Sequence, residues 1–61
     1  MVRIICKGSE GNKKFFFDND MGEPLEIDAE CVATFAYVWL QDDKLKVTVE
    51  SDDLTIFELL P

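Results

Sequence analysis

Residues 25–41 read LEIDAECVATFAYVWLQ, seventeen residues without a glycine or a proline. Every odd-numbered position from Leu25 to Trp39 is apolar, which is the period of two expected of a strand with one buried face. The even-numbered positions are charged as far as Glu30 and mostly apolar from Val32 onward. The pattern therefore predicts a strand whose second face enters the interior halfway along its length.

A straight strand of this length would extend about 55 Å at about 3.3 Å per residue, which is longer than strands usually are. We therefore expect a bulge or a sharp bend between Glu30 and Val32. The rival interpretation is a helix over about residues 29–40, with Asp28 as its N-cap and Glu30 in its first turn. The β-branched and aromatic residues favour the strand, and the alanines favour the helix.

Turn-forming residues divide the rest of the chain into short strands. They gather at residues 8–12, 18–24, 41–44 and 51–53. The segments with strand-like apolar patterns are residues 1–7, 13–17, 45–50 and 54–60. The sequence thus predicts one small domain over residues 1–61, mainly β, with five antiparallel strands in a meander or a partly open barrel. The alternative is an α+β fold, in which one helix over about residues 29–40 covers a four-stranded antiparallel sheet.

The chain is acidic, with a formal net charge of −7, thirteen Asp and Glu residues, six Lys and Arg residues, and no histidine. Nucleic-acid binding depends on Lys and Arg side chains that neutralise phosphates. We therefore expect a protein partner with a basic surface, and no direct binding to nucleic acid. The apolar run at the start is too short for a signal peptide, and no segment has the length of a membrane span. These features predict a cytoplasmic protein that does not bind a membrane.

A domain of this size buries only about 60% of the surface of its unfolded chain, so its stability is marginal without added support. We expect Cys6 and Cys31 to be reduced, buried and apolar in role rather than joined as a disulfide. Self-association is the remaining source of stability, and we expect a homodimer. The apolar residues expected to form its interface are Phe15, Phe16, Phe17, Phe35, Tyr37 and Trp39.

Catalytic and metal-binding groups are scarce. The absence of histidine removes the commonest general base and the usual activator of a nucleophile. Residues 18–23, DNDMGE, resemble the opening of a calcium loop, but Gly22 stands where an oxygen ligand is needed and Ala29 where a bidentate glutamate is needed. We therefore expect no enzyme activity, no cofactor and no metal site.

The acidic residues point to protein binding. Glu26, Asp28 and Glu30 alternate along the expected strand, so they would share one face at intervals of about 6.6 to 6.8 Å. Duplex DNA has a phosphate about every 3.4 Å along each strand, so imitation of nucleic acid needs further acids on an adjacent rim and a dimer that doubles the array. The candidate partner-binding residues are Glu26, Asp28, Glu30, Asp42, Asp43, Asp52 and Asp53.

The function expected from these features is that of a non-enzymatic acidic protein-binding module. A nucleic-acid-binding host protein is the expected target, inhibited by mimicry of nucleic acid, as small phage or mobile-element proteins do. Two alternatives stay open. One is a homo-oligomeric assembly protein that uses its aromatic apolar faces, and the other is a small-ligand-binding domain with a pocket beneath the aromatic cluster.

Overall fold

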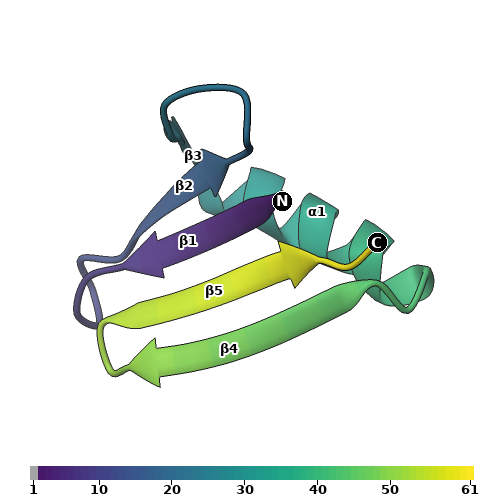
Figure 1. The fold of residues 1–61 in the computed structure, drawn as a ribbon. Helices are drawn as coiled ribbons and strands as arrows, with labels where there is room; N and C mark the ends of the chain where they lie inside the picture. The colour runs from purple at the N-terminus through teal and green to yellow at the C-terminus, as the bar shows by residue number, and fades with distance from the viewer. Residues whose placement is uncertain (1) are drawn as a thin grey trace.

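Five strands form one antiparallel sheet, and a single helix lies across one of its faces (Figure 1). The computed structural model describes residues 2–61. Along the chain the elements are β1 (Arg3–Lys7), β2 (Lys14–Asp18), β3 (Leu25–Ile27), α1 (Ala29–Gln41), β4 (Leu45–Ser51) and β5 (Leu54–Leu59). The spatial order of the strands is β3-β2-β1-β5-β4, so β3 and β4 are the two edges. The predicted mainly β fold with five antiparallel strands is confirmed, and the sheet is open rather than closed.

The prediction of one bent strand over residues 25–41 is wrong. β3 contains only Leu25–Ile27, and α1 begins at Ala29, as the helical alternative over about residues 29–40 proposed. Asp28 has extended backbone angles, and its Oδ1 accepts a hydrogen bond from the Cys31 N–H at 2.8 Å. This N-cap satisfies one of the free N–H groups at the start of the helix and fixes where the helix begins. The helical alternative missed one element, because it left only four strands in the sheet.

The helix carries the chain from one edge of the sheet to the other. β1, β2 and β3 follow one another as neighbours, and α1 then crosses the sheet to β4, from which β5 returns to pair with β1. The turn after the helix places Asp43 at a φ of 54°, a left-handed conformation that Asp adopts more readily than most residues. The Lys44 N–H then donates to the Trp39 carbonyl at 2.8 Å, which closes the turn into β4.

The core lies between the helix and the sheet. Ile4 of the central strand β1 is 0% exposed, and it packs in one cluster with Val32 and Trp39 of α1. The strand register places Phe17 and Phe57 on either side of Ile4. Half-buried apolar residues complete the cluster: Val2, Phe15, Phe17, Ile27, Leu45, Phe57 and Leu59.

Aromatic rings connect the helix to the β2 side of the sheet. The rings of Phe17 and Phe35 stack with their centroids 5.3 Å apart, and Phe35 also contacts Trp39 at 5.9 Å. Such pairs add to the stabilisation that burial alone provides. The side of α1 that carries Phe35 therefore faces β2, and the opposite side faces β5 and β4.

The other face of the sheet has no helix over it. Its side chains form rows across the strands, because directly paired residues point to the same face. Ile5 lies between Phe16 and Ile56 in one row. The neighbouring row alternates in charge, and its members in spatial order are Asp18, Arg3, Glu58 and Lys46.

The two adjacent isoleucines of β1 provide a matched test of which face holds the core. Ile4→Val removes one methyl group from a fully buried site, so we expect a loss of about 0.5 to 1.5 kcal/mol in the free energy of unfolding. Ile5→Val removes the same group from the half-buried, uncovered face and should cost less than half as much. Urea denaturation followed by circular dichroism measures both. Equal losses would mean that both faces are equally packed.

Candidate functional site

Negative charge is concentrated along one edge of the molecule. Between residues 18 and 30 the chain has six acidic residues and no basic one, whereas the rest has seven acidic and six basic residues. This segment runs from the end of β2 through the next loop and the edge strand β3 into the first turn of α1 (Figure 1). We call it the acidic edge, and its acids are Asp18, Asp20, Glu23, Glu26, Asp28 and Glu30. It accounts for nearly all of the net charge of −7.

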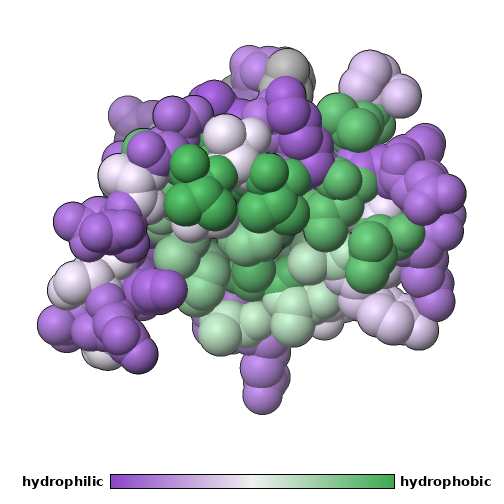
Figure 2. Space-filling model, turned by 90° about the horizontal axis from the view of Figure 1, so that it is seen from below, coloured by the Kyte–Doolittle hydropathy of each residue, from purple (hydrophilic) through white to green (hydrophobic). Residues whose placement is uncertain are grey.

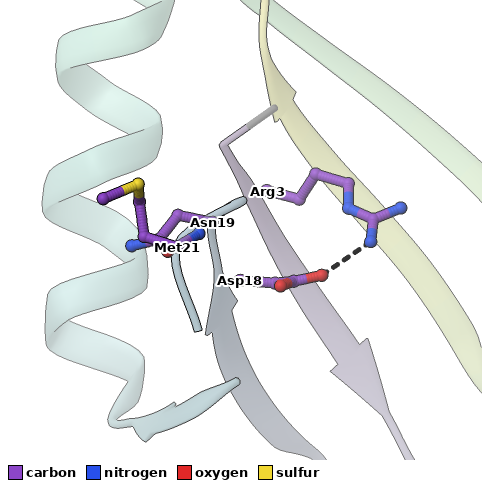
Figure 3. A network of polar contacts seen from close by, with 4 residues as sticks. All are labelled: Arg3, Asp18, Asn19 and Met21. Atoms are coloured by element: carbon purple, nitrogen blue, oxygen red, sulfur yellow. Dashed lines mark hydrogen bonds and ion pairs between the residues drawn. The ribbon is translucent and has the colours of Figure 1, made fainter. Parts of the chain in front are cut away.

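Figure 3 shows side chains at the start of the acidic edge, with the contact between Arg3 and Asp18 as a dashed line. Asp18 Oδ2 accepts a hydrogen bond from Arg3 Nη2 at 2.6 Å, which neutralises this carboxylate and ties the end of β2 to β1. In the loop that follows, Asn19 Oδ1 accepts a hydrogen bond from the Met21 N–H at 2.8 Å, a local turn typical of Asn. The remaining glutamates of the segment, Glu23, Glu26 and Glu30, are exposed.

Asp28 has a structural role as well as a charge. The hydrogen bond from the Cys31 N–H to its carboxylate is the main reason that the pKa of Asp28 lies below its ordinary value of 3.8. A hydrogen bond between the Cys31 thiol and the Asp28 carboxylate is the main reason that the pKa of this thiol lies above its ordinary value of 9.0, because the bond favours the protonated form. Cys31 is therefore a poor nucleophile at neutral pH.

A hollow of about 320 Å³ opens beside the start of α1. Two carboxylates, a thiol, a hydroxyl and an aromatic ring line it: Asp28, Glu30, Cys31, Thr34 and Phe35. An aromatic surface next to carboxylates suits the side chain of a lysine or an arginine, whose stem packs on apolar groups while its charge stays near the acids.

A second hollow, of about 190 Å³, lies on the uncovered face of the sheet. Ile5, Lys7, Phe16 and Pro24 line it. It is smaller than the usual range for small-molecule sites, which begins at about 300 Å³. Phe35 lines the first hollow, and neither Tyr37 nor Trp39 lines either of the two.

The predicted acidic residues do not form a single row. Glu26, Asp28 and Glu30 lie on β3, at the helix N-cap and on α1, so they do not share one strand face, although they follow one another within the acidic edge. The remaining four divide into two pairs at opposite ends of β4: Asp42 with Asp43, and Asp52 with Asp53. Seven residues of strand separate the pairs by about 23 Å at about 3.3 Å per residue. The structure therefore does not bring the predicted acids together on an adjacent rim.

The aromatic residues expected at a dimer interface are also divided. Trp39 belongs to the buried core, and Phe15 and Phe17 pack against it. Phe16 lies on the opposite, uncovered face of the sheet, in the row of Ile5. Of the six, Phe35 and Tyr37 are the large apolar side chains left exposed, both on α1.

Sequence reasoning missed two features of the surface. Asp18, Asp20 and Glu23 were not grouped with the candidate acids, although their position in one run without a basic residue was visible. Val47 and Val49 supply the apolar pattern of the strand predicted over residues 45–50, yet they are 50% and 71% exposed. No sequence signal distinguishes these valines from core residues, because their exposure depends on how far α1 reaches across the sheet.

Both cysteines are free thiols. Cys6 is buried on β1, as expected. The expectation that Cys31 is buried is wrong, because it lies on a flank of α1 that faces away from the sheet.

No protein-family model matches the sequence, and neither a curated protein nor a solved structure is significantly similar to it. Within residues 2–61 no helix combines the length and the apolar character needed to cross a membrane. The same residues contain no group of three or more Cys, Asp or Glu side chains arranged to hold a metal ion.

The N-cap role of Asp28 predicts a pH-dependent effect on stability. Asp28→Ala should lower the melting temperature at pH 7 by about 4 to 8 °C, whereas Asp28→Asn keeps an acceptor and should lower it much less. Because the pKa of Asp28 is lowered in the folded protein, its stabilising charge is fully present above the unfolded value near 3.8 and is lost as the pH falls below it. Thermal unfolding from pH 2 to pH 7 measures this effect. The difference in melting temperature between the wild type and Asp28→Ala should become smaller in acid. A difference in melting temperature that does not change with pH would contradict a stabilising role for the ionised Asp28 carboxylate.

The two thiols should differ in accessibility. We expect a thiol reagent such as dithionitrobenzoate to modify Cys31 in the folded protein and Cys6 only on unfolding. Because the pKa of Cys31 is raised by Asp28, Asp28→Asn should speed the modification at pH 8. The Cys31→Ser variant, as a control, should show no modification before unfolding. Equal reactivity of both thiols in the native state would contradict this assignment.

Proposed function

We propose that this protein is a non-enzymatic binding module whose acidic edge docks on a basic surface of another protein. The observation that supports the proposal is the location of the charge: almost the whole net charge belongs to one continuous segment at one edge of the sheet. Charges gathered on one surface steer a partner of opposite charge and set its orientation more effectively than the same charges spread over the molecule.

The hollow at the start of α1 adds a contact for a single basic side chain. The exposed carboxylates of Asp28 and Glu30 lie beside the ring of Phe35 there. A lysine or arginine that enters this hollow meets both charge and apolar surface, so the partner's basic residue is held by more than long-range attraction.

Extended basic surfaces are characteristic of proteins that bind nucleic acids, because those proteins must neutralise many phosphates. We therefore propose a nucleic-acid-binding protein as the target, and inhibition by occupation of its basic groove as the mechanism. The carboxylates belong to a loop, an edge strand and a helix rather than to one regular row, so the proposed competition for the groove does not require an imitation of phosphate spacing. The two free thiols suit a reducing compartment, and we propose that the protein acts in the cytoplasm.

The test compares two variants with the same net charge. In the edge variant, Glu23→Gln, Glu26→Gln and Glu30→Gln neutralise exposed acids of the acidic edge and spare the ion-paired Asp18 and the capping Asp28. In the control variant, Asp42→Asn, Asp43→Asn and Asp52→Asn make the same change in charge elsewhere. Each variant is immobilised and incubated with lysate of the source cell at about 50 mM and about 500 mM salt.

We expect the wild type and the control variant to capture a nucleic-acid-binding protein at low salt. The edge variant should capture at least about tenfold less of this protein. High salt and added duplex DNA should both release the captured protein, because the contact is electrostatic and uses the groove that binds DNA. Capture that the edge variant retains, or that both variants lose equally, would rule out the acidic edge as the binding surface.

A further inference from the structure

Among the strands of residues 2–61, the edge strand β4 is the longest, and none of the others pairs with its outer side. Two of its valines share the face that α1 covers elsewhere, yet Val47 is 50% and Val49 71% exposed. Long edge strands with apolar side chains are normally shortened, covered or charged, because they pair with other strands. The outer side of β4 is thus an unsatisfied strand edge next to exposed apolar surface.

The hydrogen-bond pattern shows which backbone groups of β4 point outward. The Leu60 N–H donates to the Lys44 carbonyl at 2.7 Å, which sets the phase of the ladder between β4 and β5. Bonded and non-bonded residues alternate along an antiparallel ladder, so the even-numbered residues of β4 direct their backbone groups at β5. Val47 and Val49 therefore direct theirs away from the sheet, where an added strand would bond to them.

The charges of β4 are complementary to those of a second, antiparallel copy of the same strand. The β4–β5 ladder is regular as far as Val49 and has an irregularity between Val49 and Ser51, so Glu50 has no partner on β5. With a two-fold axis at Thr48, Val47 lies opposite the second copy's Val49. Lys46 then lies next to the second copy's Glu50, at this irregularity. The outward backbone groups of the valines then meet in bonded pairs. Moving the axis by one residue in either direction leaves either Lys46 or Glu50 opposite an uncharged Thr48. Asp42 and Asp43 precede the strand and lie outside the paired segment.

The helix α1 adds to the exposed apolar surface that Val47 and Val49 form on β4. Ala29, Ala33, Ala36 and Leu40 follow one another at helical spacing, so they share one flank of α1. This flank lies opposite the one where Phe35 stacks on β2. Its C-terminal part, which contains Ala36 and Leu40, lies toward β4, because α1 starts beside β3 and ends at β4. Figure 2 views the molecule from the β4 side and shows a broad apolar area at its centre with polar residues around it. Small side chains on this flank let a second helix approach closely when β4 pairs with its copy.

The position of the negative charge also favours β4, rather than β3, as the edge at which two copies pair. The acidic edge lies at β3, on the opposite side of the sheet. Pairing through β4 makes a ten-stranded sheet in which the two acidic edges lie about 40 Å apart, at about 4.8 Å per strand. This distance is several times the screening length of about 8 Å at physiological salt, so the two negative segments do not repel each other.

We propose that two copies of this chain form a symmetric dimer by antiparallel pairing of β4 with β4 about a two-fold axis at Thr48. The dimer buries the exposed valines and the C-terminal part of the alanine flank of α1. It thereby adds to a small core in which Ile4 is the one fully buried large side chain among residues 2–61. It also presents an acidic edge at each end of the joined sheet. The proposal does not depend on the proposed function, because it concerns the opposite edge and needs no partner protein.

Sedimentation equilibrium of the purified protein from about 1 to 100 µM tests the dimer and its register together. We expect the wild type to have twice the monomer mass of 7.0 kDa. Lys46→Glu and Glu50→Lys should each raise the dissociation constant of the dimer by at least about tenfold. Because the dimer is symmetric, each substitution replaces two attractive charge pairs with two repulsive ones. The double variant Lys46→Glu with Glu50→Lys restores opposite charges and should return the dimer to within about threefold of the wild type.

A second pair of variants tests the apolar part. Val49→Lys places a charge beside the second copy's Val47 in the apolar part of the interface and should give a monomer. Val38→Lys, at an exposed site on the other flank of α1, should leave the dimer intact. Circular dichroism confirms that both variants remain folded, as expected for exposed positions. A wild type that is monomeric at 100 µM, or a double charge variant as weak as the single ones, would overturn the proposal.

Discussion

The contact of Val32 and Trp39 with Ile4 holds the helix on the sheet, and every other feature of the surface follows from it. A helix of thirteen residues is about 20 Å long and about 10 Å wide, whereas five strands at about 4.8 Å form a sheet about as wide as the helix is long. One helix therefore covers only part of one face. Because Phe35 draws α1 toward β2, the uncovered part falls at β4, where Val47 and Val49 remain exposed.

The strands could be predicted from the sequence because turn residues separate them and each has a clear alternation. Residues 29–41 could not be assigned with the same rules, since ten of these thirteen residues are apolar and no period stands out. Val, Phe, Tyr and Trp prefer strands, but tertiary packing overrides such preferences when a helix is needed to cover a sheet. The local signal that decided the outcome is Asp28, whose carboxylate caps the helix.

The acidic character of the protein was predictable from composition, but the position of the acids was not. The two Asp-Asp pairs looked like one feature because they are ten residues apart, yet a strand separates them and sends them to opposite ends of the sheet. The acids between residues 18 and 30 remain together because the loop, the short strand β3 and the helix start are all at one edge. Which residues stay together depends on strand order, and strand order is not encoded in any short pattern.

The two edges of the sheet differ in the ways that proteins use to control strand pairing. β3 has three residues, and the acidic segment around it would repel a second copy of itself, so it resists addition of another like strand. β4 has seven residues, and Lys46 and Glu50 lie on either side of its centre, so its own antiparallel copy matches it in charge. The path of α1 explains why these properties occur together. The helix starts among the acids beside β3 and ends at β4, so its capping end belongs to the charged edge and its C-terminal end to the apolar one. In this small chain the acidic surface and the apolar surface therefore lie at opposite edges of the sheet.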